Sequence, residues 1–94
     1  MEAELLQRDR FDFDDGTFAE MVIWRVPSPV HGSRHHYRYR LFHGRSGKRL
    51  VGDDNKRQKG DHRHVQDREE PYSFKDVDTL VRDFFAAIER RRSK

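Results

Sequence analysis

Residues 76–92 read DVDTLVRDFFAAIERRR, and this stretch decides the fold class of the chain. Asp76, alone or together with Ser73, can cap the first turn of a helix, and the arginines at 90–92 suit the negative end of a helix dipole. The pattern predicts one amphipathic helix over about residues 76–91 that buries its aromatic side in the core. The positions that follow the helical period are Val77, Leu80, Val81, Phe84, Phe85 and Ile88.

The chain before this helix has the period of two that is typical of β-strands. Residues 3–13 predict a first strand, followed by a turn at Asp14-Asp15-Gly16. Residues 17–26 are apolar on both faces, so this strand is expected inside the sheet. Residues 34–42 alternate between an apolar face with Tyr37, Tyr39 and Leu41 and a cationic face with His36, Arg38 and Arg40.

A hairpin and a loop complete the predicted sheet. Residues 48–52 predict a returning strand after a turn, and residues 53–60 predict a polar loop. We therefore expect a single α+β domain over residues 1–94, with strands over about 3–75 and the helix over about 76–91. Its antiparallel sheet would carry the C-terminal amphipathic helix on one face and leave the other face open.

The charge distribution points to a polyanionic partner. The 94 residues include 20 Lys and Arg against 17 Asp and Glu, and residues 31–59 are strongly basic. Such a block is typical of nucleic-acid binding, although a solvated cationic face is the alternative. The absence of cysteine excludes disulfides, thiolate nucleophiles and cysteine-based zinc sites. With no apolar run of membrane-spanning length and no signal-peptide pattern at the start, we expect a cytoplasmic protein without a membrane partner.

The most informative polar segment is KGDHRH, residues 59–64. If the backbone after Gly60 is extended, His62 and His64 lie on one face of a strand, and Asp61 and Arg63 lie on the other. Two imidazoles among cations suit proton transfer on a phosphodiester or the binding of a metal ion. The alternative is a polar surface turn without chemistry.

RNA carries its own nucleophile, the 2′-hydroxyl, so a ribonuclease needs only a base, an acid and cations around the phosphate. His62 and His64 are the candidates for proton transfer, Lys59 for a charge at the phosphate, and Asp61 for orienting an imidazole. Further phosphate contacts are expected from Arg38, Arg40, Arg57 and Arg63. Base stacking is expected from Tyr37, Tyr39 and Tyr72, each of which has a structural role as the alternative.

The same histidines allow a metal alternative. His62 and His64, with Asp54 or Asp61 as the oxygen ligand, could bind zinc or manganese. The cations nearby disfavour a divalent ion, so neither a metal nor another cofactor is expected. The remaining histidines are expected at the surface: His31, His35, His36 and His43. The sequence shows no phosphate-binding glycine loop, no paired carboxylates of two-metal nucleases and no helix-turn-helix pattern.

Taken in order, these features resemble the TumE-like toxins of type II toxin–antitoxin systems. The resemblance implies a growth-inhibiting toxin, ribonuclease action, and a helix-turn-helix DNA-binding antitoxin as partner. A non-catalytic toxin that binds RNA or the ribosome by charge is the alternative, beside the metal-dependent nuclease. The matching residues are 3–6, 22–27, 37–42, Asp54-Asn55, 59–64 and the helix that starts at Asp76-Val77.

One position departs from the family pattern. An aromatic residue usually precedes Asp-Asn, whereas this chain has Asp53 there. We expect an acidic group at this place to weaken the binding of RNA phosphate.

Overall fold

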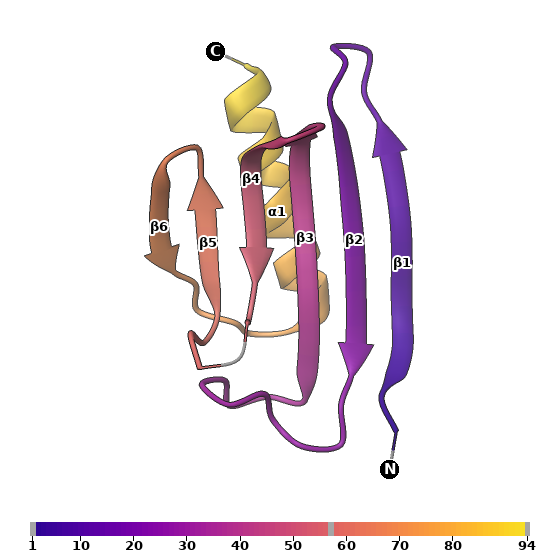
Figure 1. Cartoon of the computed structure of the whole chain (residues 1–94), viewed down its shortest axis with the longest axis vertical. Coiled ribbons are helices and arrows are strands. Elements are labelled where there is room, and N and C mark those ends of the chain that lie inside the picture. The colour runs from indigo at the N-terminus through magenta and orange to yellow at the C-terminus, as the bar shows by residue number, and fades with distance from the viewer. Residues whose placement is uncertain (1, 57, 94) are drawn as a thin grey trace.

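The computed structural model describes residues 2–56 and 58–93. In this part of the chain, six antiparallel strands form one sheet in sequence order, and a single helix lies behind it (Figure 1). This confirms the predicted α+β fold. The strands are β1 (Glu4–Asp12), β2 (Phe18–Arg25), β3 (Tyr37–Arg45), β4 (Lys48–Asp54), β5 (His62–Val65) and β6 (Arg68–Pro71), and the helix is α1 (Val77–Arg92).

The helix forms where the apolar period predicts it. The side chain of Asp76 caps its first turn by accepting a hydrogen bond from the backbone N–H of Thr79 at 2.7 Å. Leu80, Phe84 and Ile88 are fully buried between α1 and the sheet. They meet the residues of the sheet that point toward the helix, which are Ala19, Met21, Ile23, Tyr39, Leu41 and Val51.

Strand alternation gives the sheet two different faces. Buried and half-buried residues alternate along β2, with Met21 and Ile23 in the core below α1. We call this the helix-covered face. Residues of the opposite parity form the open face, where the register aligns Val22 with Arg40, Arg40 with Asp54, and Asp54 with His62. The cationic side of β3 therefore lies on the open face, as the sequence predicts.

Two parts of the sheet differ from the sequence prediction. Residues 53 and 54, expected in a loop, belong to β4, because a buried ion pair lets Asp53 occupy a strand position below the helix. The edge strand β6 was not predicted, since its residues are all exposed and show no apolar alternation. A short, charged edge strand of this kind resists pairing with other chains.

His43 corrects another expectation, because it is fully buried instead of exposed. It lies on the helix-covered face, where its Nδ1 is 3.2 Å from the carbonyl oxygen of Phe18. The Arg91 guanidinium donates from Nε to His43 Nε2 at 2.8 Å, which requires a neutral imidazole. Burial, followed by the charge of Arg91, lowers the pKa of His43. His35 is also more buried than expected, whereas His31 and His36 are exposed.

Candidate active site

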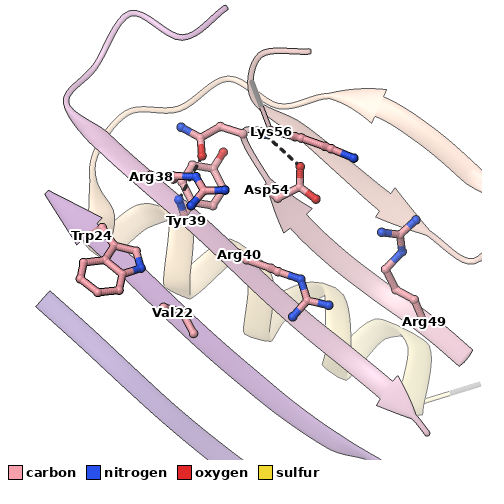
Figure 2. A pocket seen from close by; sticks show the side chains of 9 residues that line it. Val22, Trp24, Arg38, Tyr39, Arg40, Arg49, Asp54 and Lys56 are labelled. Carbon is pink, nitrogen blue, oxygen red and sulfur yellow. Dashed lines mark hydrogen bonds between the residues drawn. The ribbon is translucent and has the colours of Figure 1, made fainter. Parts of the chain in front are cut away.

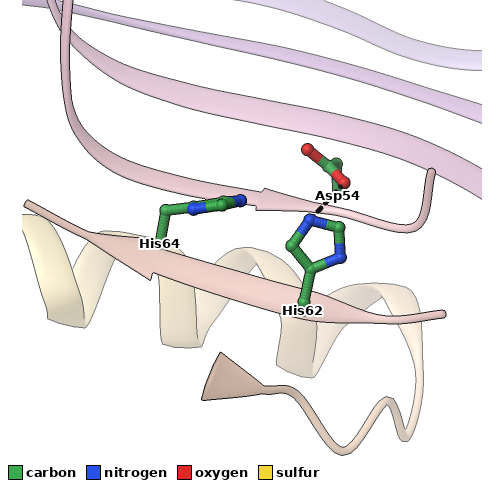
Figure 3. Close-up of side chains that lie close together, drawn as sticks. All are labelled: Asp54, His62 and His64. Atoms are coloured by element: carbon green, nitrogen blue, oxygen red, sulfur yellow. Dashed lines mark ion pairs between the residues drawn. The ribbon is translucent and has the colours of Figure 1, made fainter. Parts of the chain in front are cut away.

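Asp54, His62 and His64 come together on the open face, and we call them the histidine cluster (Figure 3). Asp54 and His62 are direct partners in the register of β4 and β5. His62 Nε2 lies 2.9 Å from Asp54 Oδ1, and the rings of His62 and His64 pack edge to face with centroids 4.9 Å apart. The structure therefore brings the two histidines to one face, as their spacing predicts.

His62 is held at both ring nitrogens. Its side chain is 7% exposed, and its Nδ1 lies 3.0 Å from the carbonyl oxygen of Gly60. A carbonyl and a carboxylate both accept, so hydrogen bonds to Gly60 and Asp54 require a proton on each nitrogen. This arrangement suits the imidazolium form, which can act as a general acid.

Gly60 positions His62 through its backbone, and only glycine fits there. Its φ is +74°, and a Cβ would lie 2.9 Å from the carbonyl oxygen of Gly32. Gly32 has the same restriction, because a Cβ on it would lie 2.8 Å from the nitrogen of Gly60. The loop before β3 and the loop before β5 thus touch backbone to backbone beside the cluster.

His64 has a different environment from His62. Burial, followed by the charge of Arg49, lowers the pKa of His64 and favours the neutral imidazole. His64 Nε2 lies 3.4 Å from Glu69 Oε2, and the Lys59 ammonium lies 3.1 Å from the same oxygen. Lys59, a predicted site residue, therefore lies beside the cluster, with the Glu69 carboxylate between its ammonium group and His64. Two imidazoles in contact but in such different surroundings are suited to serve as acid and base.

A basic pocket of about 490 Å³ borders the cluster on the open face (Figure 2). Asp54 belongs to both the pocket and the cluster. The predicted phosphate-contact residues Arg38 and Arg40 lie here, together with Arg49 and Lys56, and all four side chains are exposed. The complete lining is Val22, Trp24, Arg38, Tyr39, Arg40, Arg49, Asp54, Asn55 and Lys56.

The aromatic and cationic lining residues to which the sequence analysis gave no role are Trp24, Arg49 and Lys56. Trp24 lies two residues after Val22 and therefore on the same face of β2. Val22 is paired with Arg40, so alternation along this strand could have placed Trp24 on the cationic face. Arg49 was harder to find, because a register shift between His43 and Gly44 breaks the alternation of the hairpin. Lys56 follows the strand end, where no periodic signal exists.

Arg63 lies away from the cluster, against the expectation that it contacts phosphate. It is buried on the helix-covered face, where its guanidinium pairs with Asp53 through contacts of 2.7 and 3.2 Å. The guanidinium also lies over the Tyr72 ring, 4.8 Å from its centroid. The edge of the guanidinium formed by Nε and Nη2 is occupied by Asp53 inside the protein, so Arg63 is a structural residue here. Arg57, another predicted contact, lies outside the described residues.

The three tyrosines also do not belong to the histidine cluster. Tyr39 is 3% exposed in the core, and Tyr72 donates from its hydroxyl to Asp83 at 2.7 Å. Burial and the neighbouring carboxylates raise the pKa of both phenols. Tyr37 lies near Phe74, with ring centroids 5.8 Å apart. The structural alternative therefore describes all three better than base stacking.

Asp61 orients a histidine, but not one of the cluster. Its carboxylate accepts hydrogen bonds at 2.7 Å from Ser33 Oγ, His35 Nε2 and the Tyr39 hydroxyl. His35 Nδ1 accepts from the backbone N–H of Tyr37, which places the ring proton on Nε2, toward Asp61. These bonds fasten the loop before β3 to the residue that precedes His62. We call these four residues, of which Tyr39 is buried and the others are half-buried, the buried network: Ser33, His35, Tyr39 and Asp61.

The histidine cluster is the set of described residues that fits a metal ion. One ligand atom from each of Asp54, His62 and His64 lies within 4.8 Å of the others. The contact between His62 Nδ1 and a backbone carbonyl is the usual support of a metal-binding imidazole. Asp61, the other predicted oxygen ligand, is held by the buried network. The alternative of a metal site thus remains open with Asp54 as its carboxylate.

The family model described as Toxin TumE matches residues 2–92. The chain belongs to the TumE toxin family. It is accordingly a toxin of a toxin–antitoxin system, and an antitoxin is its partner. No curated protein and no solved structure matches the chain. Within the described residues, no helix is long and apolar enough to cross a membrane.

Asp53 of this TumE toxin, where the family usually has an aromatic residue, lies on the face of the sheet that is turned away from the histidine cluster. Its carboxylate is fully buried on the helix-covered face and is paired with Arg63. The open face, with Arg40 and the histidines, lies on the other side of the sheet. The Asp53 carboxylate therefore does not face the place where a phosphate would approach the cluster.

Proposed function

We propose that this TumE toxin is a ribonuclease that cleaves RNA at the histidine cluster without a metal ion. The observation that supports this proposal is the contact of two differently held imidazoles at the rim of a basic pocket. His62 is bound by two oxygen acceptors, whereas burial and the charge of Arg49 lower the pKa of His64 and favour its neutral form. One chain thus supplies an acid and a base within reach of one phosphate.

The reaction follows from these two states. Neutral His64 takes the proton of the 2′-hydroxyl, and the 2′-oxygen attacks the adjacent phosphorus. His62 donates its proton to the 5′-oxygen as the bond from phosphorus to that oxygen breaks. The products are a 2′,3′-cyclic phosphate and a free 5′-hydroxyl. Asp54 stabilises the charge of His62 before the transfer and fixes its ring.

Cations stabilise the negative charge that develops on the phosphorane. Arg40 is the direct strand partner of Asp54. Arg49 is close enough to His64 for its charge, after burial, to lower the pKa of that imidazole. Both guanidiniums are exposed on the open face and free to turn toward a phosphate. Donors fixed near such a charge are commonly the largest single contribution to catalysis.

Cleavage of a short RNA by the purified toxin, in excess chelator, tests the proposal. We expect His62→Ala and His64→Ala each to lower the rate at least about 10²-fold. His31→Ala, which alters an exposed histidine outside the cluster, is the matched control and should cleave normally. The products should carry cyclic phosphates, and a 2′-deoxy substrate should resist. Normal cleavage by both cluster variants would overturn the proposal.

A metal-dependent nuclease is the second candidate, because three potential ligand atoms lie within 4.8 Å. A metal-bound hydroxide needs no 2′-hydroxyl, so this enzyme would also cut the 2′-deoxy strand. Its activity would vanish with chelator and return with zinc or manganese. If neither condition gives cleavage while RNA is still bound, the non-catalytic RNA-binding toxin becomes the better description.

For the antitoxin we propose a helix-turn-helix DNA-binding protein, as the family resemblance implies. Neutralisation would follow directly if the antitoxin covers the open face, and an acidic segment would complement Arg38, Arg40 and Lys56. Titration of the toxin with the protein encoded beside it should then abolish both RNA binding and cleavage. Full activity of the saturated complex would contradict this arrangement.

A further inference from the structure

Trp24 is the single tryptophan of the chain, and it lines the basic pocket on the open face (Figure 2). We propose that its indole is a stacking platform for a base of single-stranded RNA, on a nucleotide next along the strand from the one cut at His62 and His64. This inference rests on the proposed function for the identity of the ligand. The stacking itself can be measured without cleavage.

The first argument is that Trp24 has no aromatic partner. Among the described residues, every phenylalanine and tyrosine packs against another ring or lies below an arginine, whereas Trp24 does neither. Two other aromatic residues of the open face show the contrast: Arg10 covers the Phe18 ring at 4.1 Å, and Arg40 lies 5.6 Å from the centroid of Phe42. An indole that faces a pocket with no ring against it is available to a ligand.

The second argument is the charge around it. Arg38 is the direct strand partner of Trp24, and Arg40, Arg49 and Lys56 follow around the pocket. Asp54, which already pairs with His62, is the one acidic side chain among the described residues that line it. A flat aromatic surface among cations is how single-stranded nucleic acids are held without sequence readout. An acidic peptide would use the cations but would not require the indole.

The third argument is distance. Trp24 stands on β2 and His62 on β5, so three strand-to-strand steps separate them. At about 4.8 Å per step, the lateral separation is roughly 14 Å. A base on Trp24 and a phosphate at His62 must then belong to different nucleotides, with Arg40 between them. Trp24 would thus fix the direction in which the strand crosses the sheet.

Tryptophan fluorescence tests the inference, because Trp24 is the one source of tryptophan emission in the chain. The probe is a short single-stranded RNA with methylated 2′-hydroxyls, which the proposed reaction cannot cut. We expect this oligonucleotide to quench the emission, and an abasic strand of equal charge to quench it far less. In a separate anisotropy titration, Trp24→Ala should bind about 10- to 100-fold more weakly, whereas Trp24→Phe should bind nearly normally.

The outcomes separate the two proposals. Equal quenching by the abasic strand, or unchanged affinity of a folded Trp24→Ala protein, would overturn stacking even if cleavage occurs at the histidines. Quenching and weaker binding by Trp24→Ala without any cleavage would support stacking and reject the ribonuclease. A Trp24→Ala protein that loses the antitoxin but keeps RNA would show that the indole serves the protein partner, and would also overturn stacking. Circular dichroism of each variant confirms that it is folded.

Discussion

Asp53 and Asp54 are neighbours in the chain, yet their carboxylates lie on opposite faces of the sheet. Asp53 is buried below α1 with Arg63, and Asp54 meets His62 on the open face. Because side chains alternate along a strand, one step of the chain separates a residue of the core from a residue of the candidate site. Stability and activity should therefore respond separately to changes at these two positions.

Arg63→Met should destabilise the protein strongly, because it leaves the buried Asp53 carboxylate without its partner. Breaking a buried ion pair on one side costs about 3–5 kcal/mol. Urea denaturation should show this loss in the free energy of unfolding. The double variant Asp53→Leu/Arg63→Met should recover most of it, since no charge remains buried. A double variant as unstable as the single one would show that packing of Arg63 on Tyr72 dominates instead.

Asp54→Asn should have the opposite effect: the stability of the fold should change little, and the rate of RNA cleavage should fall. Its carboxylate is partly exposed, so we expect a change in the free energy of unfolding below about 1 kcal/mol. The rate of RNA cleavage should fall roughly 10²-fold, because the amide no longer stabilises the His62 imidazolium. Urea denaturation checks the expected stability, and the initial rate of cleavage checks the expected loss of activity. A variant that unfolds easily but cleaves normally would contradict the division between the two faces.

Arg49→Ala should change the pH dependence of cleavage. The charge of Arg49 lowers the pKa of His64, so its removal should raise that pKa and keep the base protonated to higher pH. The acidic limb of the kcat/KM profile should move to higher pH. Arg49→Lys retains the charge and serves as the control, with an acidic limb close to that of the wild type. An equal loss at every pH in Arg49→Ala would assign Arg49 to phosphate binding alone.

His43 should make the fold sensitive to acid. Its pKa is lowered in the folded protein by burial and Arg91, so the unfolded chain binds the proton more readily. This contribution to stability is present above the ordinary histidine pKa of about 6.5 and is lost as the pH falls below it. His43→Gln removes the titrating group, and its Tm should fall less between neutral and mildly acidic buffer than the wild-type Tm. If Tm falls equally with pH in the variant and the wild type, His43 is not the origin of the acid sensitivity.

The sequence predicts the elements of this fold more readily than the contacts between them. The helical period and its cap at Asp76 define α1, and the spacing of His62 and His64 places both on one face. Those patterns are local. The partners of Arg63 and Asp61 are set by pairing between distant strands and loops, which no local pattern contains. The sequence predicts polar residues such as Asp53 and His43 to be exposed, because their burial depends on partners far along the chain.

The tyrosines and Trp24 show the same limit in the candidate site. Alternation along residues 34–42 correctly separates Tyr37 and Tyr39 from Arg38 and Arg40 and places the arginines on the open face, but it does not say which aromatic residue lies beside them. Trp24 lies on that face and lines the basic pocket, whereas Tyr39 is buried in the core below α1. The register shift in the hairpin, which brings Arg49 to the pocket, has no signature in the sequence.

The buried network has a consequence for how related toxins vary. Ser33, His35 and Tyr39 all hydrogen-bond to the carboxylate of Asp61. The backbones of Gly32 and Gly60 lie so close together that neither position has room for a side chain. A substitution at any of these positions is tolerated only if its partners change with it. We therefore expect these positions to covary among homologues, and the loop before β3 to be inherited as a unit with the segment that carries the histidines.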